Sequence, residues 1–238
     1  MRVFLAGASG AIGRRLTPLL LAAGHHVTGM TRKPDAARGL EAAGLAAVIV
    51  DAFDESALKR AVTNARPDIV IHQLTDLPRV FDETELAASL PRNARIRIEG
   101  TRNLIAAAQA ASVRRFIVQS IAFGYAPSTE PRAETDPLDL AGPRAATVQG
   151  AANMEEQVLA SGMQAVVLRY GLLYGPGTWT DRPSRKPPLH VDAAAHAALL
   201  AVTRDATGIY NIANDDGMVS IAKARAELGF DPAFRSPV

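Results

Sequence analysis

Short apolar runs alternate with amphipathic, helix-forming stretches along most of the chain. The first pair is an apolar run at residues 3–6 followed by a helical pattern from about residue 11 to 23. The same alternation predicts further strands at residues 27–31, 47–50, 69–72, 115–119, 165–169 and 209–212. It predicts intervening helices at residues 36–43, 55–63, 145–160 and 191–202, a long one ending near residue 111, and a short one before residue 229. Short apolar strands joined by helices require crossover connections, so the pattern predicts an α/β fold with a Rossmann-type, doubly wound parallel sheet.

After Tyr170 the sequence becomes richer in glycine and proline. Gly175-Pro176-Gly177 and the basic, proline-rich residues 181–188 are typical of a loop, which could be either a lid or a disordered connection. The chain after Tyr170 is too short to form an independent second domain. We therefore expect residues 1–170 to form the nucleotide-binding domain and residues 171–238 a small C-terminal substrate-side cap built on it.

Length and composition narrow the classes of protein further. The 238 residues are 48% hydrophobic, yet no apolar run approaches the roughly 18 residues of a membrane helix, and the chain does not start like a signal peptide. We expect a cytoplasmic protein with no membrane partner. With no cysteine there is no thiolate chemistry, and the five histidines show no metal-site spacing, so no metal is expected. The adjacent His25 and His26 are expected to be solvated at a turn.

The charge pattern does not indicate a polyanionic partner. The 26 basic and 24 acidic residues give a net charge of +2, and the basic ones are scattered along the chain. A nucleic-acid-binding protein would instead gather them into a patch or stripe. No nucleic acid is expected, and the phosphates of a cofactor are sufficient anionic partners.

A glycine-rich turn follows the first strand, with the sequence Gly7-Ala8-Ser9-Gly10-Ala11-Ile12-Gly13. Three glycines allow a tight turn and a close approach of the backbone to a pyrophosphate, and the helix that follows directs its unpaired amides at that anion. We expect the cofactor phosphates to be held by Gly7, Ser9, Gly10, Ala11 and Ile12.

The ends of the next strands indicate which dinucleotide is bound. An NAD enzyme usually has an acidic residue after the second strand, whereas this chain has Arg32 and Lys33, which suit the 2'-phosphate of NADP(H). The alternative is a solvated basic turn. Asp51 and Ala52 after the third strand are expected beside the adenine, and Gln73 and Leu74 after the fourth beside the nicotinamide ribose.

Several motifs together resemble the extended short-chain dehydrogenase/reductase family, the NAD-dependent epimerase/dehydratase group. They are the glycine turn, Gly100-Thr101-Arg102-Asn103-Leu104, Phe116-Ile117-Val118-Gln119-Ser120, Leu168-Arg169-Tyr170-Gly171, Tyr174-Gly175-Pro176-Gly177 and His190-Val191-Asp192. The resemblance implies a bound NAD(P), with Ser120 and Tyr170 near the nicotinamide and Ala122, Phe123, Tyr174 and His190 near a substrate. The family often forms homodimers through its fourth and fifth helices, and the mixed character of residues 83–103 leaves this open.

The family's Tyr-x-x-x-Lys pair is missing from this chain. The family's register places Val148 and Ala152, or Thr147 and Ala151, at its two positions, and no tyrosine of the chain is followed four residues later by lysine. In the family the tyrosine transfers the proton while the lysine lowers its pKa. The sequence is therefore that of an atypical member.

Three functions remain open. The first is an NADPH-dependent ketoreductase acting on a small or aromatic, polyketide-like ketone, as in antibiotic biosynthesis. Ser120 would polarise the carbonyl, and the proton would come from Tyr125, His72, water or a phenol of the substrate. The second is an inactive NADP-binding sensor protein. The third, a sugar-nucleotide epimerase or dehydratase, ranks last because it needs the missing tyrosine.

Overall fold

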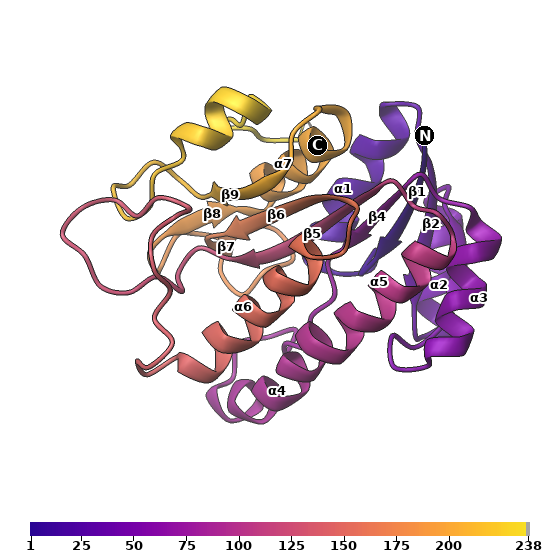
Figure 1. Ribbon diagram of the computed structural model, residues 1–238, viewed down its shortest axis with the longest axis horizontal. Coiled ribbons are helices and arrows are strands. Elements are labelled where there is room, and N and C mark those ends of the chain that lie inside the picture. Colours follow the sequence, from indigo (N-terminus) through magenta and orange to yellow (C-terminus); the bar gives the residue numbers. More distant parts are fainter. Residues whose placement is uncertain (237–238) are drawn as a thin grey trace.

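A seven-stranded parallel sheet forms the centre of the molecule and carries helices on both faces (Figure 1). The computed structural model describes residues 1–236. The strand order is β3-β2-β1-β4-β5-β6-β9, and every neighbouring pair is parallel. The sheet comprises β1 (Arg2–Ala6), β2 (His26–Thr31), β3 (Ala46–Ile49), β4 (Ile69–His72), β5 (Arg115–Ile121), β6 (Gln164–Tyr170) and β9 (Gly208–Ile212). The predicted doubly wound α/β fold is confirmed.

The helices divide between the two faces of the sheet. They are α1 (Ala11–Ala22), α2 (Pro34–Ala42), α3 (Glu55–Ala65), α4 (Glu83–Arg95), α5 (Thr101–Ala110), α6 (Ala145–Leu159) and α7 (Val191–Thr203). Helices α1 and α7 cover one face and α5 and α6 the other, as Figure 1 shows. Alternate residues of β1 follow this division, because Val3 and Leu5 belong to one apolar core and Phe4 and Ala6 to the other. A strand buried on both faces has to be apolar throughout, which explains its unbroken hydrophobic run.

The long helix predicted to end near residue 111 is a composite element. Helix α4 passes into a π-helical turn at Ile96–Gly100, which continues into α5. Such turns occur in many proteins beside functional sites. A second π-helical turn, Ala224–Leu228, lies where the sequence predicts the last short helix.

Residues after β6 extend the main sheet and add a small second one. Strand β9 pairs with β6, and α7 packs against α1. Strands β7 (Leu172–Tyr174) and β8 (Pro188–His190) form a two-stranded parallel sheet that the sequence pattern does not predict. In the described part of the chain, residues 1–236, no helix is long and apolar enough to cross a membrane.

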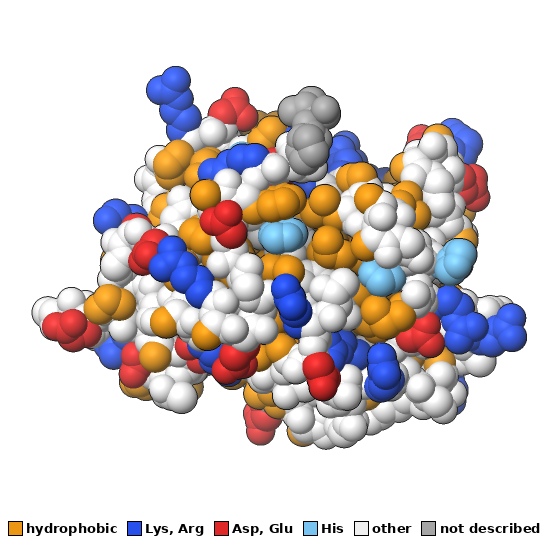
Figure 2. Space-filling model, turned by 90° about the horizontal axis from the view of Figure 1, so that it is seen from above, with side chains coloured by type: hydrophobic (Ala, Val, Ile, Leu, Met, Phe, Trp, Pro, Cys, Tyr) orange, Lys and Arg blue, Asp and Glu red, His pale blue; other side chains and the backbone are white. Residues whose placement is uncertain are grey.

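The structure shows how the charged side chains are distributed and how far His25 and His26 are exposed. On the face shown in Figure 2, basic side chains are dispersed among acidic and apolar ones. The expectation of a solvated histidine pair is wrong for His25, which is buried and lies 3.4 Å from the Met1 amino group through its Nδ1. His26 is exposed, as expected.

Candidate functional site

The direction of winding reverses between β1 and β4. The chain proceeds from β1 to β2 and β3 on one side and from β4 to β5 and β6 on the other. In open α/β sheets, ligands bind beside the carboxyl ends of the strands at this reversal. The residues that end β1 and β4 are therefore the natural starting point for a site.

The glycine turn at the end of β1 fits a phosphate-binding role. Gly7 has φ +95°, and a Cβ built on it would lie 2.6 Å from the Gln73 carbonyl oxygen. A Cβ on Gly13 would lie 2.3 Å from the Gly7 oxygen, so both positions exclude a side chain. Helix α1 begins at Ala11 after Gly10, and no side chain within residues 1–236 caps it through a hydrogen bond. The first turn therefore presents backbone N–H groups, together with its positive dipole end, to an anion.

Gln73 supplies a second observation at the same edge. Its backbone N–H continues the β1–β4 ladder to Ala6, and its side-chain Nε2 donates to the Tyr170 hydroxyl at 3.3 Å. Its Oε1 is buried and has no hydrogen-bond partner among residues 1–236. An unpaired buried acceptor costs about 1–3 kcal/mol, so a donor from a bound molecule would remove this penalty. Gln73 and Tyr170, both expected at the cofactor, are brought together by the fold.

The remaining expected cofactor residues lie at neighbouring strand ends. Arg32 and Lys33 are exposed after β2, directly before α2. Asp51, after β3, accepts the Phe53 N–H at 3.0 Å, and the Ala52 carbonyl accepts the Asn103 side chain at 2.9 Å. These contacts fix the loop after β3 while leaving Arg32 and Lys33 available to an anion.

Leu74, which follows Gln73, is held through its backbone. Its N–H donates to His72 Nδ1 at 3.2 Å, and its carbonyl accepts Gln119 Nε2 at 3.2 Å. These bonds fix the start of the connection after β4.

A buried ion pair connects α6 with the end of β6. The Glu155 carboxylate takes two hydrogen bonds from the Arg169 guanidinium, Nε–Oε1 at 2.9 Å and Nη2–Oε2 at 2.6 Å. Both side chains are about 5% exposed. Burial opposes the charge of Arg169, but the hydrogen bonds and charge of Glu155 outweigh it and keep the pKa of Arg169 above its ordinary value. Sequence reasoning missed Glu155; its only signal was an arginine inside the apolar run of β6, which required a buried partner.

Ser120, near the end of β5, belongs to the same cluster. Its hydroxyl donates to Glu155 Oε1 at 2.5 Å, and the residue is 5% exposed. The donor capacity of the hydroxyl is thus committed to a buried carboxylate. The catalytic role of Ser120 stays a prediction, and this bond favours a positioning role.

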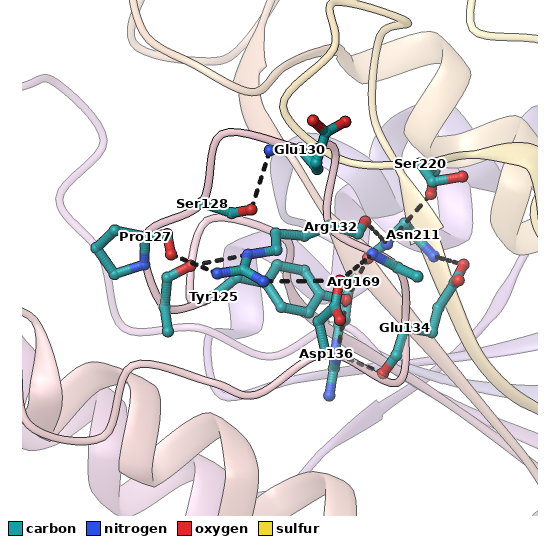
Figure 3. A network of polar contacts seen from close by, with 12 residues as sticks. Tyr125, Pro127, Ser128, Glu130, Arg132, Glu134, Asp136, Arg169, Asn211 and Ser220 are labelled. Atoms are coloured by element: carbon teal, nitrogen blue, oxygen red, sulfur yellow. Dashed lines mark hydrogen bonds and ion pairs between the residues drawn. The ribbon is translucent and has the colours of Figure 1, made fainter.

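Tyr125 lies in the network that attaches the β5–α6 connection to the sheet (Figure 3). Its hydroxyl accepts from Arg169 Nη1 at 2.7 Å and donates to Asn211 Oδ1 at 2.7 Å. Asn211 in turn donates to the carbonyls of Arg132 and Ser220. Burial raises the pKa of Tyr125 above its ordinary value, although Arg169 opposes the shift, so the phenol is protonated at neutral pH. Its role as proton donor stays a prediction.

His72 ends β4 in a fully buried position. Its Nε2 lies 3.0 Å from Thr101 Oγ1, and its Nδ1 accepts the Leu74 N–H. Burial, with a contribution from Arg97, lowers the pKa of His72 to about 3. Both ring nitrogens are engaged and the ring is neutral, which argues against His72 as the proton donor.

The expected substrate residues form separate groups. The Ala122 N–H donates to the Tyr170 carbonyl at 2.8 Å. The rings of Tyr174 and His190 meet edge to face with centroids 5.1 Å apart, and His190 caps α7. Phe123 packs elsewhere, against a small apolar cluster.

That apolar cluster contains one position from each of the two registers considered for the family's missing pair, Val148 from the first and Ala151 from the second. Val148 and Ala151 of α6 are each 1% exposed and pack with Ile121 at the end of β5. Phe123 and Leu138 close the cluster. The remaining positions, Ala152 of the first register and Thr147 of the second, are partly buried outside the cluster, so neither register places a tyrosine or a lysine there.

Two surface hollows lie at the opposite, amino-terminal edge of the sheet. The larger, about 510 Å³, is lined by residues that include Arg2, Arg66 and Arg114, and the smaller is about 250 Å³. Neither contains an expected site residue, and ligands of this fold bind at the other edge.

Comparison with known proteins agrees with this geometry. The sequence profile of the NAD dependent epimerase/dehydratase family matches residues 3–213. A Streptomyces protein named 3-diazoavenalumate denitrifying reductase is 41% identical over 91% of this chain and 77% of its own length. An uncharacterized Mycobacterium tuberculosis protein is 32% identical over 97% of this chain, which spans 22% of that protein.

Solved structures show the same fold at low identity. The UDP-glucose 4-epimerase of Thermus thermophilus, in complex with NAD, superposes with a TM-score of 0.78 at 21% identity, covering 99% of this chain and 95% of the epimerase. The UDP-glucuronic acid 4-epimerase of Bacillus cereus, with UDP-glucuronic acid and NAD, gives 0.80 at 16% identity, covering 99% and 95%.

Proposed function

The chain belongs to the NAD-dependent epimerase/dehydratase family, as an enzyme of the NAD-dependent oxidoreductase and epimerase type, and we propose that it is an NADPH-dependent reductase acting without a protein proton donor. The observation that carries the proposal is that neither register supplies a proton-transferring pair: Val148 and Ala152 stand there in one, Thr147 and Ala151 in the other, and Val148 and Ala151 are buried in an apolar cluster. A reaction that needs a positioned acid or base would lose a factor of roughly 10² to 10⁴ there. The proton must therefore come from the substrate or from water, or the reaction must need none.

A reduced nicotinamide dinucleotide would supply the hydride when bound. The backbone of the glycine turn would hold its pyrophosphate, and Arg32 and Lys33 would pair with a 2'-phosphate. Asp51 and Ala52 would border the adenine, and the Gln73 side chain would offer its unpaired Oε1 to the nicotinamide end. The preference for NADP over NAD rests on the basic pair after β2.

Two substrate classes could be reduced without a proton donor from the protein. The first is an aromatic diazo compound, and the 41% identity to the Streptomyces reductase favours it. Its diazonium carbon gains a hydride while the C–N bond breaks and that electron pair leaves with neutral N₂, so no proton is required. The second is a ketone beside a phenol, which gains a hydride at carbon and a proton at oxygen from its own hydroxyl or from water.

The residues of the chain would then act by position and by exclusion of water. The buried bonds of Ser120 and Tyr125 fix the ends of β5 and β6, and the cluster around Val148 keeps one wall of the site dry. Proximity and orientation alone can contribute about 7–11 kcal/mol to a hydride transfer. The sugar-nucleotide alternative is disfavoured, because this chain lacks the tyrosine base that begins oxidation of a sugar hydroxyl.

The test is a turnover assay with NADPH and with NADH. A hydroxyarene diazonium salt and 2'-hydroxyacetophenone represent the two classes, and protein-free mixtures measure the uncatalysed rate. We expect consumption of NADPH with the diazonium salt and, when the cofactor carries deuterium at C4, deuterium in the arene product. Tight NADP⁺ binding with no turnover of either substrate would instead support the inactive sensor.

Cofactor choice is tested separately by calorimetry. Removing both charges in Arg32→Gln/Lys33→Gln should weaken NADP⁺ binding by about tenfold or more and leave NAD⁺ binding unchanged. Equal losses for the two nucleotides would refute the assignment of the 2'-phosphate.

Assembly into a homodimer remains a prediction from the family. Leu90, Ile98 and Leu159 are apolar side chains exposed on α4, the π-helical turn and α6, the elements that would take part in it. Light scattering of the purified protein would decide the oligomeric state.

A further inference from the structure

Two loops, one after β4 of the main sheet and one between β7 and β8 of the small sheet, are joined to each other by aromatic side chains. The connection after β4 contributes Phe81, and the connection between β7 and β8 contributes Trp179. The two rings meet edge to face with centroids 5.5 Å apart, and the indole Nε1 donates to the Pro78 carbonyl at 2.7 Å. Trp179 is the only tryptophan of the chain.

The first loop starts beside the glycine turn, and the second approaches the first turn of α1. The first follows Gln73, whose carbonyl lies against Gly7. The second contains Gly177, where a Cβ would lie 3.9 Å from the Arg14 guanidinium on the first turn of α1. The aromatic pair thus lies on two loops that approach the glycine turn and the first turn of α1, on the side of the sheet where a ligand of this fold binds.

The surroundings of the pair are apolar and exposed. Val80 is 79% exposed and Leu77 is 39% exposed, both within the same loop as Phe81. Large apolar side chains that gather at a ligand-binding edge mark a contact surface for an apolar group. A flat aromatic group suits them, because aromatic rings pack favourably edge to face or offset.

A basic side chain lies beside the pair. The guanidinium of Arg185 lies over the Phe81 ring, 5.0 Å from its centroid, and its side chain is exposed. The acidic residues of the first loop are already engaged, because Asp76 binds Arg92 at 3.1 Å and Asp82 caps α4. Arg185 is therefore available to an anion placed beside the rings.

We propose that Phe81 and Trp179 form the ring-binding wall of the substrate site and that Arg185 pairs with an acidic group of the substrate, which is accordingly an aromatic carboxylate. This inference rests on the proposed reductase function, since it concerns the same site. It specifies the substrate by its shape and charge, independently of the group that is reduced.

The test is a binding titration of the full chain followed by tryptophan emission, which reports on Trp179 alone. The probes are cinnamate, its neutral amide cinnamamide, and 3-cyclohexylacrylate, which keeps the carboxylate but lacks the ring. Each is titrated with and without saturating NADP⁺. We expect saturable quenching by cinnamate, with each of the other two binding roughly twofold to tenfold more weakly.

Variants separate the contributions of ring and charge. Arg185→Gln should abolish the preference for cinnamate over its amide, while Arg114→Gln, at the opposite edge of the sheet, should leave it unchanged. By calorimetry, Trp179→Phe should retain the preference for cinnamate over 3-cyclohexylacrylate, and Trp179→Leu should lose it.

Equal affinities for the three probes, or no saturable quenching in either arm, would overturn the inference. Because ligand binding is measured without turnover, such a result would leave the reductase proposal standing. Conversely, cinnamate binding without any reduction of a diazo compound or ketone would refute the proposed function and retain the aromatic wall.

Discussion

Replacing Glu155 by glutamine should destabilise the protein strongly. The carboxylate receives three short hydrogen bonds, two from Arg169 and one from Ser120, and the residue is 4% exposed. The substitution keeps the shape of the side chain but leaves the Arg169 guanidinium as an unpaired buried charge. Breaking a buried pair in this way costs about 3–5 kcal/mol, a large part of the roughly 5–15 kcal/mol by which domains are stable.

The measurement is urea unfolding at pH 7, supported by thermal melting. For a chain of this size the loss corresponds to a fall in Tm of about 6–20 °C. Glu156→Gln is the matched control, because Glu156 is the next residue of α6 and is exposed, so its substitution should change the free energy of unfolding by less than about 0.5 kcal/mol.

The double variant Glu155→Met/Arg169→Met tests the physical reason for the loss. It removes both charges and fills the space with hydrocarbon, so it should be more stable than Glu155→Gln alone. A Glu155→Gln protein within about 1 kcal/mol of the wild type would refute the reasoning, because it would mean that Arg169 finds water or another partner.

Three further changes give distinct outcomes. Gly7→Ala should lower the free energy of unfolding by about 3 kcal/mol or more, because it combines a positive φ with a backbone clash. The control Gly24→Ala, at φ +75° in open space, should cost only about 1–2 kcal/mol, and similar losses for the two variants would contradict the close approach at Gly7. Burial lowers the pKa of His72 from 6.5 to about 3, so the stability that the neutral ring contributes is present above pH 6.5 and is lost as the pH falls toward 3. His72 should therefore lower the free energy of unfolding by about 2 kcal/mol at pH 5 relative to pH 7. His72→Gln should remove that part of the slope in urea titrations and His26→Gln should retain it. Ser120→Ala should lower stability by about 1.5–3 kcal/mol while kcat falls less than tenfold, and a hundredfold fall in kcat at unchanged KM would show that the hydroxyl acts on the substrate.

The class of fold and the position of the glycine turn were predictable from the amino-acid sequence alone. Both are local properties, because a strand buried on two faces must be apolar throughout and a turn that touches another strand's backbone must lack a Cβ. The sequence therefore predicted the alternation of strands and helices, the end of the long helix near residue 111, and the glycines at 7 and 13. The absence of the Tyr-x-x-x-Lys pair was equally a matter of sequence.

Which side chains meet became clear only from the packing of the folded chain. Glu155, Arg169 and Ser120 come from one helix and two strands, and their pairing depends on the register of α6 against β5 and β6. The parallel pairing of β7 with β8 and the contact of Phe81 with Trp179 join segments whose local sequences resemble ordinary loops. Local periodicity specifies which face of an element is buried, whereas contacts between distant elements depend on how those elements pack, and the chemistry of this site lies in such contacts.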